Sequence, residues 1–186
     1  MKKQTLIFSS IFLILSALFF NACKKIDDPK PVEQELITTV KLVLIDNFLT
    51  NEYYYKVSNG FGGNGTVEFD TISIEPNKSY IASVYILNES VTPVEDVTEE
   101  IIDENLDHLL VWEYTPETGG VLTFTNGNKD DNQMPLNLTG ELNTAAAGVG
   151  ELTITLKHLP TNKNATQADA AGGNTDAQAV FPVRVQ

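Results

Sequence analysis

The sequence is poor in the residues that build the commonest reactive and metal-bound sites. It holds one cysteine and two histidines in 186 residues, which excludes an intramolecular disulfide and a paired-cysteine zinc motif. It has 12 basic residues against 25 acidic ones, and its net charge of −13 disfavours binding to nucleic acid. No Gly-x-Ser-x-Gly elbow, phosphate-cradling loop or HExxH motif occurs. We therefore expect neither an enzyme nor a nucleic-acid partner.

The one long apolar run lies at the N-terminus. Lys2 and Lys3 precede an apolar stretch over 5–20, and a small residue, Ala22, stands directly before Cys23. This order is typical of a secretory signal peptide, and the stretch is shorter than the ~20 apolar residues of a membrane-spanning helix. We predict a signal peptide over 1–22. The alternative to a modified Cys23 is an ordinary thiol left after plain secretory cleavage.

A cysteine directly after a small residue resembles the lipobox of bacterial lipoproteins, in which the thiol is lipidated and the leader removed. The resemblance implies acyl chains such as palmitate on Cys23, and two or more chains anchor a protein stably to a membrane. Residues 23–35 carry charges and two prolines, so we expect a flexible tether. The run Lys-Ile-Asp-Asp at 25–28 resembles the export signal of Bacteroidota surface lipoproteins. This implies an outer-membrane anchor with the domain at the cell surface, the periplasmic face being the alternative.

Short runs rich in β-branched and aromatic residues fill the rest of the chain. They are separated by Asn, Gly, Pro and Asp, as is typical of strands joined by turns. We predict an all-β domain over 36–186, a single antiparallel β-sandwich that is Ig-like in general architecture. The expected strands are Leu36–Asp46, Glu52–Ser58, Glu68–Glu75, Ser79–Asn88, Leu109–Thr115, Gly120–Thr125, Pro135–Leu142, Gly150–His158 and Ala179–Gln186.

One segment has helical spacing instead. Asp96 and Glu99 are three residues apart, as in the capping motif that starts a helix, and apolar residues recur at helical intervals from Ile101. We predict one short α-helix over 97–108 that caps an end of the sandwich. The run over 164–178 is predicted to be a long loop.

Three strings resemble landmarks of a family of small outer-membrane lipoproteins of the Bacteroidota. They are VEDVTEEI at 94–101, LKHLPTNK at 156–163 and GGNTDAQAVF at 172–181, and the likeness runs from about residue 35 to 186. Some members carry a type 1 periplasmic binding fold label, but this body is too short and strand-rich for that two-lobed α/β fold. The resemblance implies location more than activity.

Fold class and location together suggest a non-enzymatic binding or accessory lipoprotein with an outer-membrane nutrient-uptake receptor as its partner. A structural surface protein with no small ligand is an alternative. A metal-binding lipoprotein is another, since Glu104 and His108 would lie one turn apart on the predicted helix and His158 ends a predicted strand. Two imidazoles and a carboxylate suit zinc, copper or iron. Otherwise each histidine would hydrogen-bond a nearby loop.

A loop over 126–132 offers oxygen ligands. Its candidate calcium ligands are Asn126, Asn128, Asp130 and Asp131. The loop lacks the spacing of an EF-hand and contains Lys129, so a solvated hairpin tip is the alternative.

Aromatic residues concentrate in two predicted strands. Tyr53 and Tyr55 share one strand face, and Trp112 and Tyr114 share another. Such a strip can stack on the sugar rings of a glycan or contact a peptide ligand. The alternative is that these side chains fill the core, with their polar atoms bonded at its rim.

Overall fold

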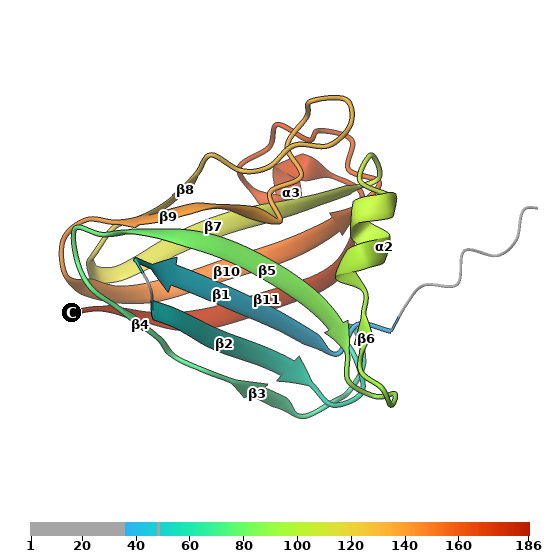
Figure 1. Cartoon of the computed structure of the whole chain (residues 1–186), viewed down its shortest axis with the longest axis horizontal. Helices are drawn as coiled ribbons and strands as arrows, with labels where there is room; N and C mark the ends of the chain where they lie inside the picture. The colour runs from blue at the N-terminus through green and yellow to red at the C-terminus, as the bar shows by residue number, and fades with distance from the viewer. Residues whose placement is uncertain (1–35, 48) are drawn as a thin grey trace, which may run out of the picture. The chain divides into compact units, whose positions relative to one another are not determined.

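The structure is a computed structural model that describes residues 36–47 and 49–186. The predicted signal peptide, Cys23 and the tether lie outside the described residues. Two β-sheets pack face to face, and Figure 1 shows β7, β10 and β11 of one sheet behind β1, β2 and β5 of the other. The all-β sandwich expected from the sequence is confirmed.

Sheet A has the strand order β3-β2-β1-β5-β9-β8, with β6 paired to the end of β5. Its strands are β1 (Thr39–Asp46), β2 (Leu49–Val57), β3 (Val67–Phe69), β5 (Ser79–Asn88), β6 (Glu95–Asp96), β8 (Leu122–Thr125) and β9 (Thr139–Thr144). Sheet B has the order β4-β11-β10-β7, with β4 (Ile72–Ile74), β7 (His108–Gly119), β10 (Gly148–His158) and β11 (Asn174–Val185). Between the described strands the pairings are antiparallel except for β4 with β11, which run parallel.

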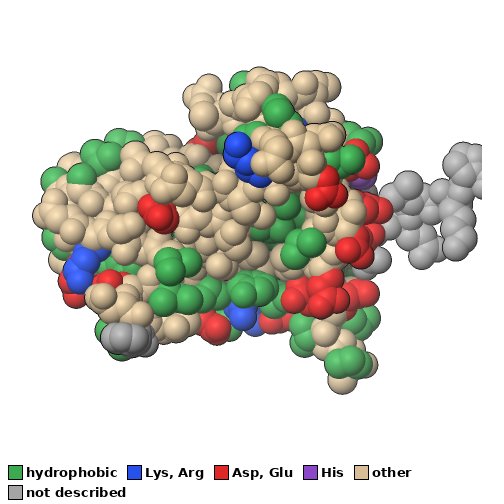
Figure 2. Space-filling view, turned by 45° about the horizontal axis from the view of Figure 1, so that its top comes forward, with side chains coloured by type: hydrophobic (Ala, Val, Ile, Leu, Met, Phe, Trp, Pro, Cys, Tyr) green, Lys and Arg blue, Asp and Glu red, His purple; other side chains and the backbone are tan. Residues whose placement is uncertain are grey.

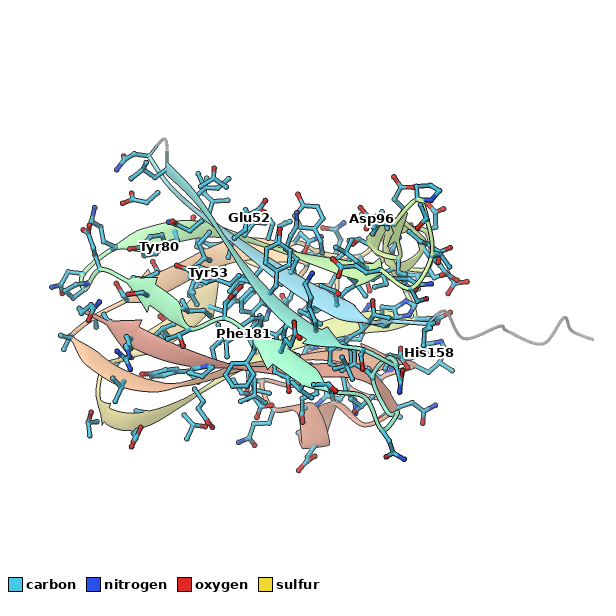
Figure 3. The ribbon with its side chains drawn as sticks, turned by 90° about the horizontal axis from the view of Figure 1, so that it is seen from below. Glu52, Tyr53, Tyr80, Asp96, His158 and Phe181 are labelled. Carbon is cyan, nitrogen blue, oxygen red and sulfur yellow. The ribbon has the colours of Figure 1, made fainter. Side chains whose placement is uncertain are left out.

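Alternating side chains build the core between the sheets. In β5 every second residue from Tyr80 to Asn88 is buried, while Ile81 and the residues alternating with it face outward. Strands of sheet B contribute Ile154 and Phe181, both fully enclosed, and Figure 3 shows Phe181 between the two layers. Each such side chain contributes about 1.5–3 kcal/mol on burial, so the cluster needs no covalent cross-link to hold it.

Several predicted elements have other boundaries. The predicted strand Glu68–Glu75 is two strands in different sheets, because the chain crosses from β3 to β4 at 70–71. The predicted strand at 135–142 begins only at Thr139, and the preceding residues form a loop against β7. The predicted loop at 164–178 contains a second short helix, α3 (Ala168–Ala171), and the first residues of β11.

The observed helix is shorter than the one predicted from the spacing of apolar residues. The helix α2 spans Thr98–Asp103, Glu104 is its C-cap, and His108 already belongs to β7. Asp96 lies one residue before the N-cap Val97, where its carboxylate accepts a hydrogen bond from the amide of Thr98. As predicted, α2 lies across an end of the sandwich (Figure 1), with Ile101 buried in the core. Among the described residues, no helix has the length and apolar character needed to cross a membrane.

Candidate metal centre

Two histidines face each other where β7 and β10 end. His108 is the first residue of β7 and His158 the last of β10, and the antiparallel register pairs them directly. Since side chains alternate along a strand, both histidines share the inner face of the sheet with Leu110 and Leu156. The imidazole rings are stacked, with centroids 4.9 Å apart and planes inclined by 10°. Figure 3 shows His158 at the end of the domain where Asp96 also lies.

A bulge in β11 brings a carboxylate to the same place. The register between β10 and β11 shifts between Leu156 and Lys157, which leaves Asp176 as an extra residue of β11. An inserted residue of this kind redirects a side chain. One donor atom from each of Asp176, His108 and His158 lies within 4.8 Å of the other two. Three adjacent strands of sheet B therefore each supply one potential metal ligand.

A glycine holds the start of β11 against the end of β10. Gly173 has φ +65°, and a Cβ atom there would overlap the carbonyl oxygens of His158 and Leu159. Only glycine combines this left-handed backbone with so close an approach. Gly173 thus fixes the distance between the strand that carries Asp176 and the strand that carries His158.

The tautomer of His108 is set by its neighbour. Nδ1 of His108 lies 3.1 Å from the backbone oxygen of Glu104. A carbonyl oxygen only accepts, so Nδ1 carries the proton and the lone pair of the neutral ring is on Nε2. Histidines that bind metals commonly donate their other ring N–H to a carbonyl in this way. His108 is buried, at 6% exposure, which holds the ring in one orientation.

A metal ion would draw the three donors closer together. Metal–nitrogen and metal–oxygen bonds of about 2.0–2.2 Å put two ligands of one tetrahedral ion about 3.3 Å apart. The donors lie within 4.8 Å of one another, so no pair has to close by more than about 1.5 Å. His158 and Asp176 are only partly buried, whereas His108 is buried.

Exposed carboxylates are concentrated in the segment that precedes His108. The segment from 95 to 107 leads into His108 and contains no lysine or arginine. Six of its carboxylate residues are exposed: Glu95, Asp96, Glu99, Asp103, Glu104 and Asp107. Figure 2 shows acidic side chains gathered at the end where a histidine reaches the surface. Such a concentration of one sign raises the local concentration of cations.

The proposed ligand set from the sequence is altered at one position. Glu104 and His108 do not share a helix face, because α2 ends at Asp103 and His108 begins a strand. Glu104 is exposed, and it is its backbone oxygen that contacts His108. Asp176 stands in the cluster where Glu104 was expected. The sequence gave no signal for Asp176, because this residue lies in a segment that was predicted to be a loop.

The candidate calcium ligands bond within the protein. The side-chain oxygen of Asn128 accepts from the amide of Thr139, and the side-chain amide of Asn126 donates to Glu141. The Oδ1 atom of Asp130 accepts from two backbone amides, those of Asn132 and Met134. Asp131 exchanges hydrogen bonds with Asn105 through its backbone amide and its carboxylate. These residues shape the loop, and their arrangement gives the calcium hypothesis no support.

A lysine supplies the cation that this loop requires. Nζ of Lys163 lies 2.6 Å from Oδ2 of Asp130, 2.7 Å from the backbone oxygen of Asn105 and 3.4 Å from that of Leu106. The Lys163 and Asp130 side chains are 10% and 1% exposed, so the ion pair is almost fully removed from water. Burial alone would raise the pKa of Asp130, but the hydrogen bonds from Lys163 and from the backbone amides of Met134 and Asn132 outweigh it, so the pKa lies below its ordinary value.

The tyrosines singled out in β2 pack against the core. The Tyr55 ring stacks on Phe61 and Phe69 and meets the edge of Phe181. The Tyr53 hydroxyl donates to the backbone oxygen of Ser73 at 3.1 Å, and burial raises the pKa of Tyr53. Both tyrosine side chains pack against the core, and they do not form an exposed aromatic strip for a ligand.

The aromatic residues of β7 are also engaged. Trp112 stacks on Phe124 with centroids 4.2 Å apart, and its indole N–H donates to the backbone oxygen of Asn137. Tyr114 packs against the core, and burial raises the pKa of its hydroxyl. Among the described side chains, the Tyr114 hydroxyl is a buried polar atom that has no hydrogen-bond partner in the structure. One pocket of about 240 Å³ borders Trp112 and Phe124, but the rings cover each other's faces.

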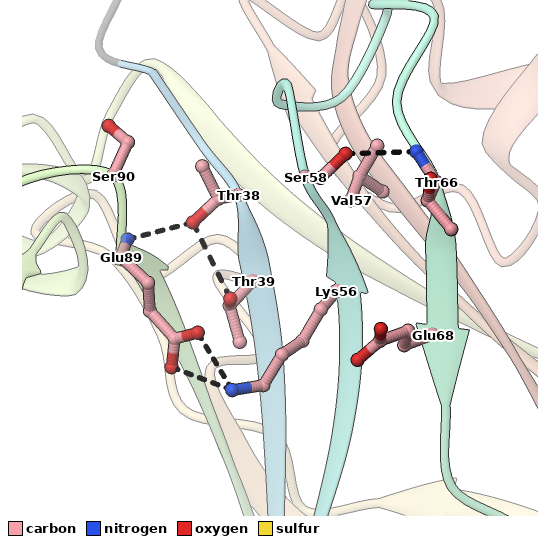
Figure 4. A pocket seen from close by; sticks show the side chains of 9 residues that line it. All are labelled: Thr38, Thr39, Lys56, Val57, Ser58, Thr66, Glu68, Glu89 and Ser90. Carbon is pink, nitrogen blue, oxygen red and sulfur yellow. Dashed lines mark hydrogen bonds and ion pairs between the residues drawn. The ribbon is translucent and has the colours of Figure 1, made fainter.

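A pocket of about 240 Å³ lies where β1, β2, β3 and β5 of sheet A come together at one end (Figure 4). Its walls carry hydroxyl groups and the ion pair between Lys56 and Glu89, whose Nζ and Oε2 atoms are 2.7 Å apart. Thr38 donates to the backbone oxygen of Leu87 and accepts from the amide of Glu89. Because the charge of Lys56 is already neutralised, the pocket has no strong attraction for an anion.

Comparison with known protein families, with curated proteins and with solved structures finds no match for this chain.

Proposed function

We propose that the domain binds one divalent transition-metal ion through His108, His158 and Asp176. The observation that carries the proposal is the convergence of three donors from β7, β10 and β11 at one end of sheet B, within 4.8 Å of one another. The hydrogen bond from His108 to the backbone oxygen of Glu104 supports it, because this bond leaves Nε2 available as a ligand.

The donor set selects the class of metal. Imidazole nitrogens suit zinc, copper, iron and nickel, whereas calcium and magnesium prefer sites made of oxygen atoms. Affinity for divalent ions at such a site rises toward Cu²⁺ and is lower for Zn²⁺. The acidic segment over 95–107 favours the approach of any cation. Zn²⁺ and Cu²⁺ are therefore the ions to test first.

The proposed location of the protein rests on the N-terminal sequence. The signal peptide over 1–22, a lipidated Cys23 and the lipoprotein resemblance support a protein anchored in the outer membrane, with the domain exposed outside the cytoplasm. A metal-binding domain in that position fits an accessory role beside a nutrient-uptake receptor. The metal would be the cargo or a structural part of the site that holds it.

The alternative is that the cluster is purely structural. In that case the carboxylate of Asp176 would neutralise a histidine, and the stacked rings would only close the end of the sandwich. The two accounts differ in their response to metal. A structural cluster gains nothing from Zn²⁺, whereas a metal site is stabilised in proportion to the logarithm of the ion concentration above the dissociation constant.

Isothermal titration with Zn²⁺ tests the proposal. The untagged mature protein is needed, because a polyhistidine tag would bind the same ions. We expect one Zn²⁺ per chain, and no binding at this stoichiometry by the H108A/H158A double variant. The exposed Asp169 of α3 offers a matched control, since D169N removes an equal charge away from the cluster. Absence of heat with both Zn²⁺ and Cu²⁺ in the unsubstituted protein would refute the metal site.

A further inference from the structure

The candidate site supplies too few ligands to enclose an ion. Among the described His, Cys, Asp and Glu residues, the cluster consists of His108, His158 and Asp176. Structural zinc sites are closed by four protein ligands, whereas sites with three protein ligands leave a position for water or an added molecule. With one oxygen of Asp176 and one nitrogen of each histidine as ligands, a four-coordinate ion here keeps one position open.

The burial of the three ligands indicates which side is open. His108 is buried, so protein atoms would shield the ion from solvent on the side of His108. His158 and Asp176 are partly exposed, and the next residue after His158, Leu159, is 54% exposed. Leu106, two residues before His108, is 47% exposed. The open position therefore faces the surface on the side of His158 and Asp176.

The charge around the site favours some ligands over others for the open position of the ion. An ion of charge +2 with one aspartate leaves a local charge of +1. Asp103 at the end of α2, and Glu104 and Asp107 in the turn that follows, are exposed. These carboxylates repel an anionic ligand such as acetate or phosphate as it approaches. A neutral imidazole meets no such repulsion and is a preferred ligand of zinc, copper and cobalt.

We infer that the metal bound at this site takes a neutral imidazole from outside the chain as a further ligand. The inference rests on the proposed function, because it requires the ion to be present. The ligand class is the histidine side chain of a peptide or of a partner protein. Through such a ligand the domain would recognise a histidine-containing segment in the presence of metal and release it when the metal is removed.

Visible spectroscopy of the Co²⁺-loaded mature protein tests this inference. The d–d bands of Co²⁺ report its ligands, and free imidazole and acetate serve as probes at equal pH and ionic strength. We expect a saturable band change with imidazole, and about tenfold weaker binding of acetate because of the acidic surroundings. Metal retained after gel filtration must stay at one per chain, so that imidazole is shown to add to the ion rather than remove it.

The possible outcomes distinguish a failure of the metal site from a failure of the added imidazole ligand. If Co²⁺, Zn²⁺ and Cu²⁺ all fail to bind, the metal site and the added ligand are both refuted. If Co²⁺ binds but imidazole leaves its bands unchanged, or if acetate binds as tightly as imidazole, the metal site stands and the inference is overturned. The variant D103N/E104Q/D107N, which keeps all three metal ligands, should narrow the difference between imidazole and acetate. An unchanged preference in this variant would also contradict the inference.

Discussion

Two regions of the domain gather polar side chains around a point, and they differ in where the cation comes from. At Asp130 the chain supplies its own cation, the Lys163 ammonium, which meets a carboxylate oxygen and two backbone oxygens. At the other region, His108, His158 and Asp176 converge, with one donor atom of each within 4.8 Å of the other two. The first region is complete as folded, and the second has the composition of a site for an added ion.

The comparison shows why oxygen-rich loops are poor predictors of metal sites. Asn126, Asn128, Asp130 and Asp131 have suitable ligand atoms, yet each side chain takes part in a hydrogen bond within the protein. The lysine that completes the loop lies far along the chain at 163, so the loop sequence alone does not reveal it. A candidate ligand is informative only when its remaining polar atoms are already satisfied and one lone pair is left, as for His108.

Removing the internal cation should have the largest effect on stability. K163M keeps much of the apolar stem but leaves the carboxylate of Asp130 buried without its ion pair. We expect a loss of about 3–5 kcal/mol in the free energy of unfolding, as for other broken buried pairs. Urea denaturation of the protein measures it. The control is K129M, an exposed lysine of the same loop, which should change stability by less than about 0.5 kcal/mol.

Moving β10 and β11 apart should have the second-largest effect on stability. Gly173→Ala places a Cβ against the carbonyl oxygens of His158 and Leu159 at a backbone with φ +65°. We expect a loss of about 2 kcal/mol in stability and a weaker Zn²⁺ affinity, because β11 must shift away from β10. Gly62 is the matched control, since it has φ +81° and no atom near its missing Cβ. G62A should share the backbone strain but leave Zn²⁺ affinity unchanged; equal effects on affinity would contradict this role of Gly173.

Removing one donor should weaken the binding of the metal. D176N retains the size of the side chain but replaces a charged ligand with a neutral one. We expect Zn²⁺ affinity to fall about 10–100-fold, measured by competition with a chromogenic chelator. D169N should retain the affinity of the unsubstituted protein. A D176N variant that binds Zn²⁺ normally would remove Asp176 from the ligand set.

The smallest effect is a dependence of stability on pH. The folded-state pKa of Asp130 lies below that of the unfolded chain, so ionised Asp130 stabilises the fold at pH values above about 4. This contribution is lost as the pH falls through the folded-state pKa, where Asp130 takes up a proton. We expect the stability difference between the unsubstituted protein and D130N to be constant above about pH 5 and to shrink below about pH 4. Chemical denaturation across this range measures the difference.

Local patterns in the sequence predict the layers of the fold well. The strand Ser79–Asn88 has its predicted bounds, because alternation of buried and exposed residues is unbroken along it. The break between β3 and β4 escaped prediction, since Glu68–Glu75 alternates throughout although the chain changes sheets at 70–71. The end of α2 was placed too late, because apolar residues continue at helical spacing into β7.

The candidate site was only partly predictable for the same reason. His108 and His158 could be paired from the sequence because each lies at the end of a predicted element. Asp176 depends on a bulge, which is a property of the register between β10 and β11 and has no local sequence pattern. The tautomer of His108 depends on the turn that follows α2, four residues earlier in the chain.

X-ray absorption spectroscopy at the zinc edge tests most directly whether the three strands meet at one ion. The sample is the mature protein loaded with one Zn²⁺ per chain in a buffer without imidazole. The account predicts two imidazole ligands, seen by their multiple scattering, with nitrogen and oxygen donors at about 2.0–2.2 Å and no sulfur. A spectrum of zinc surrounded by oxygen alone, or one identical in the H108A/H158A variant, would contradict it.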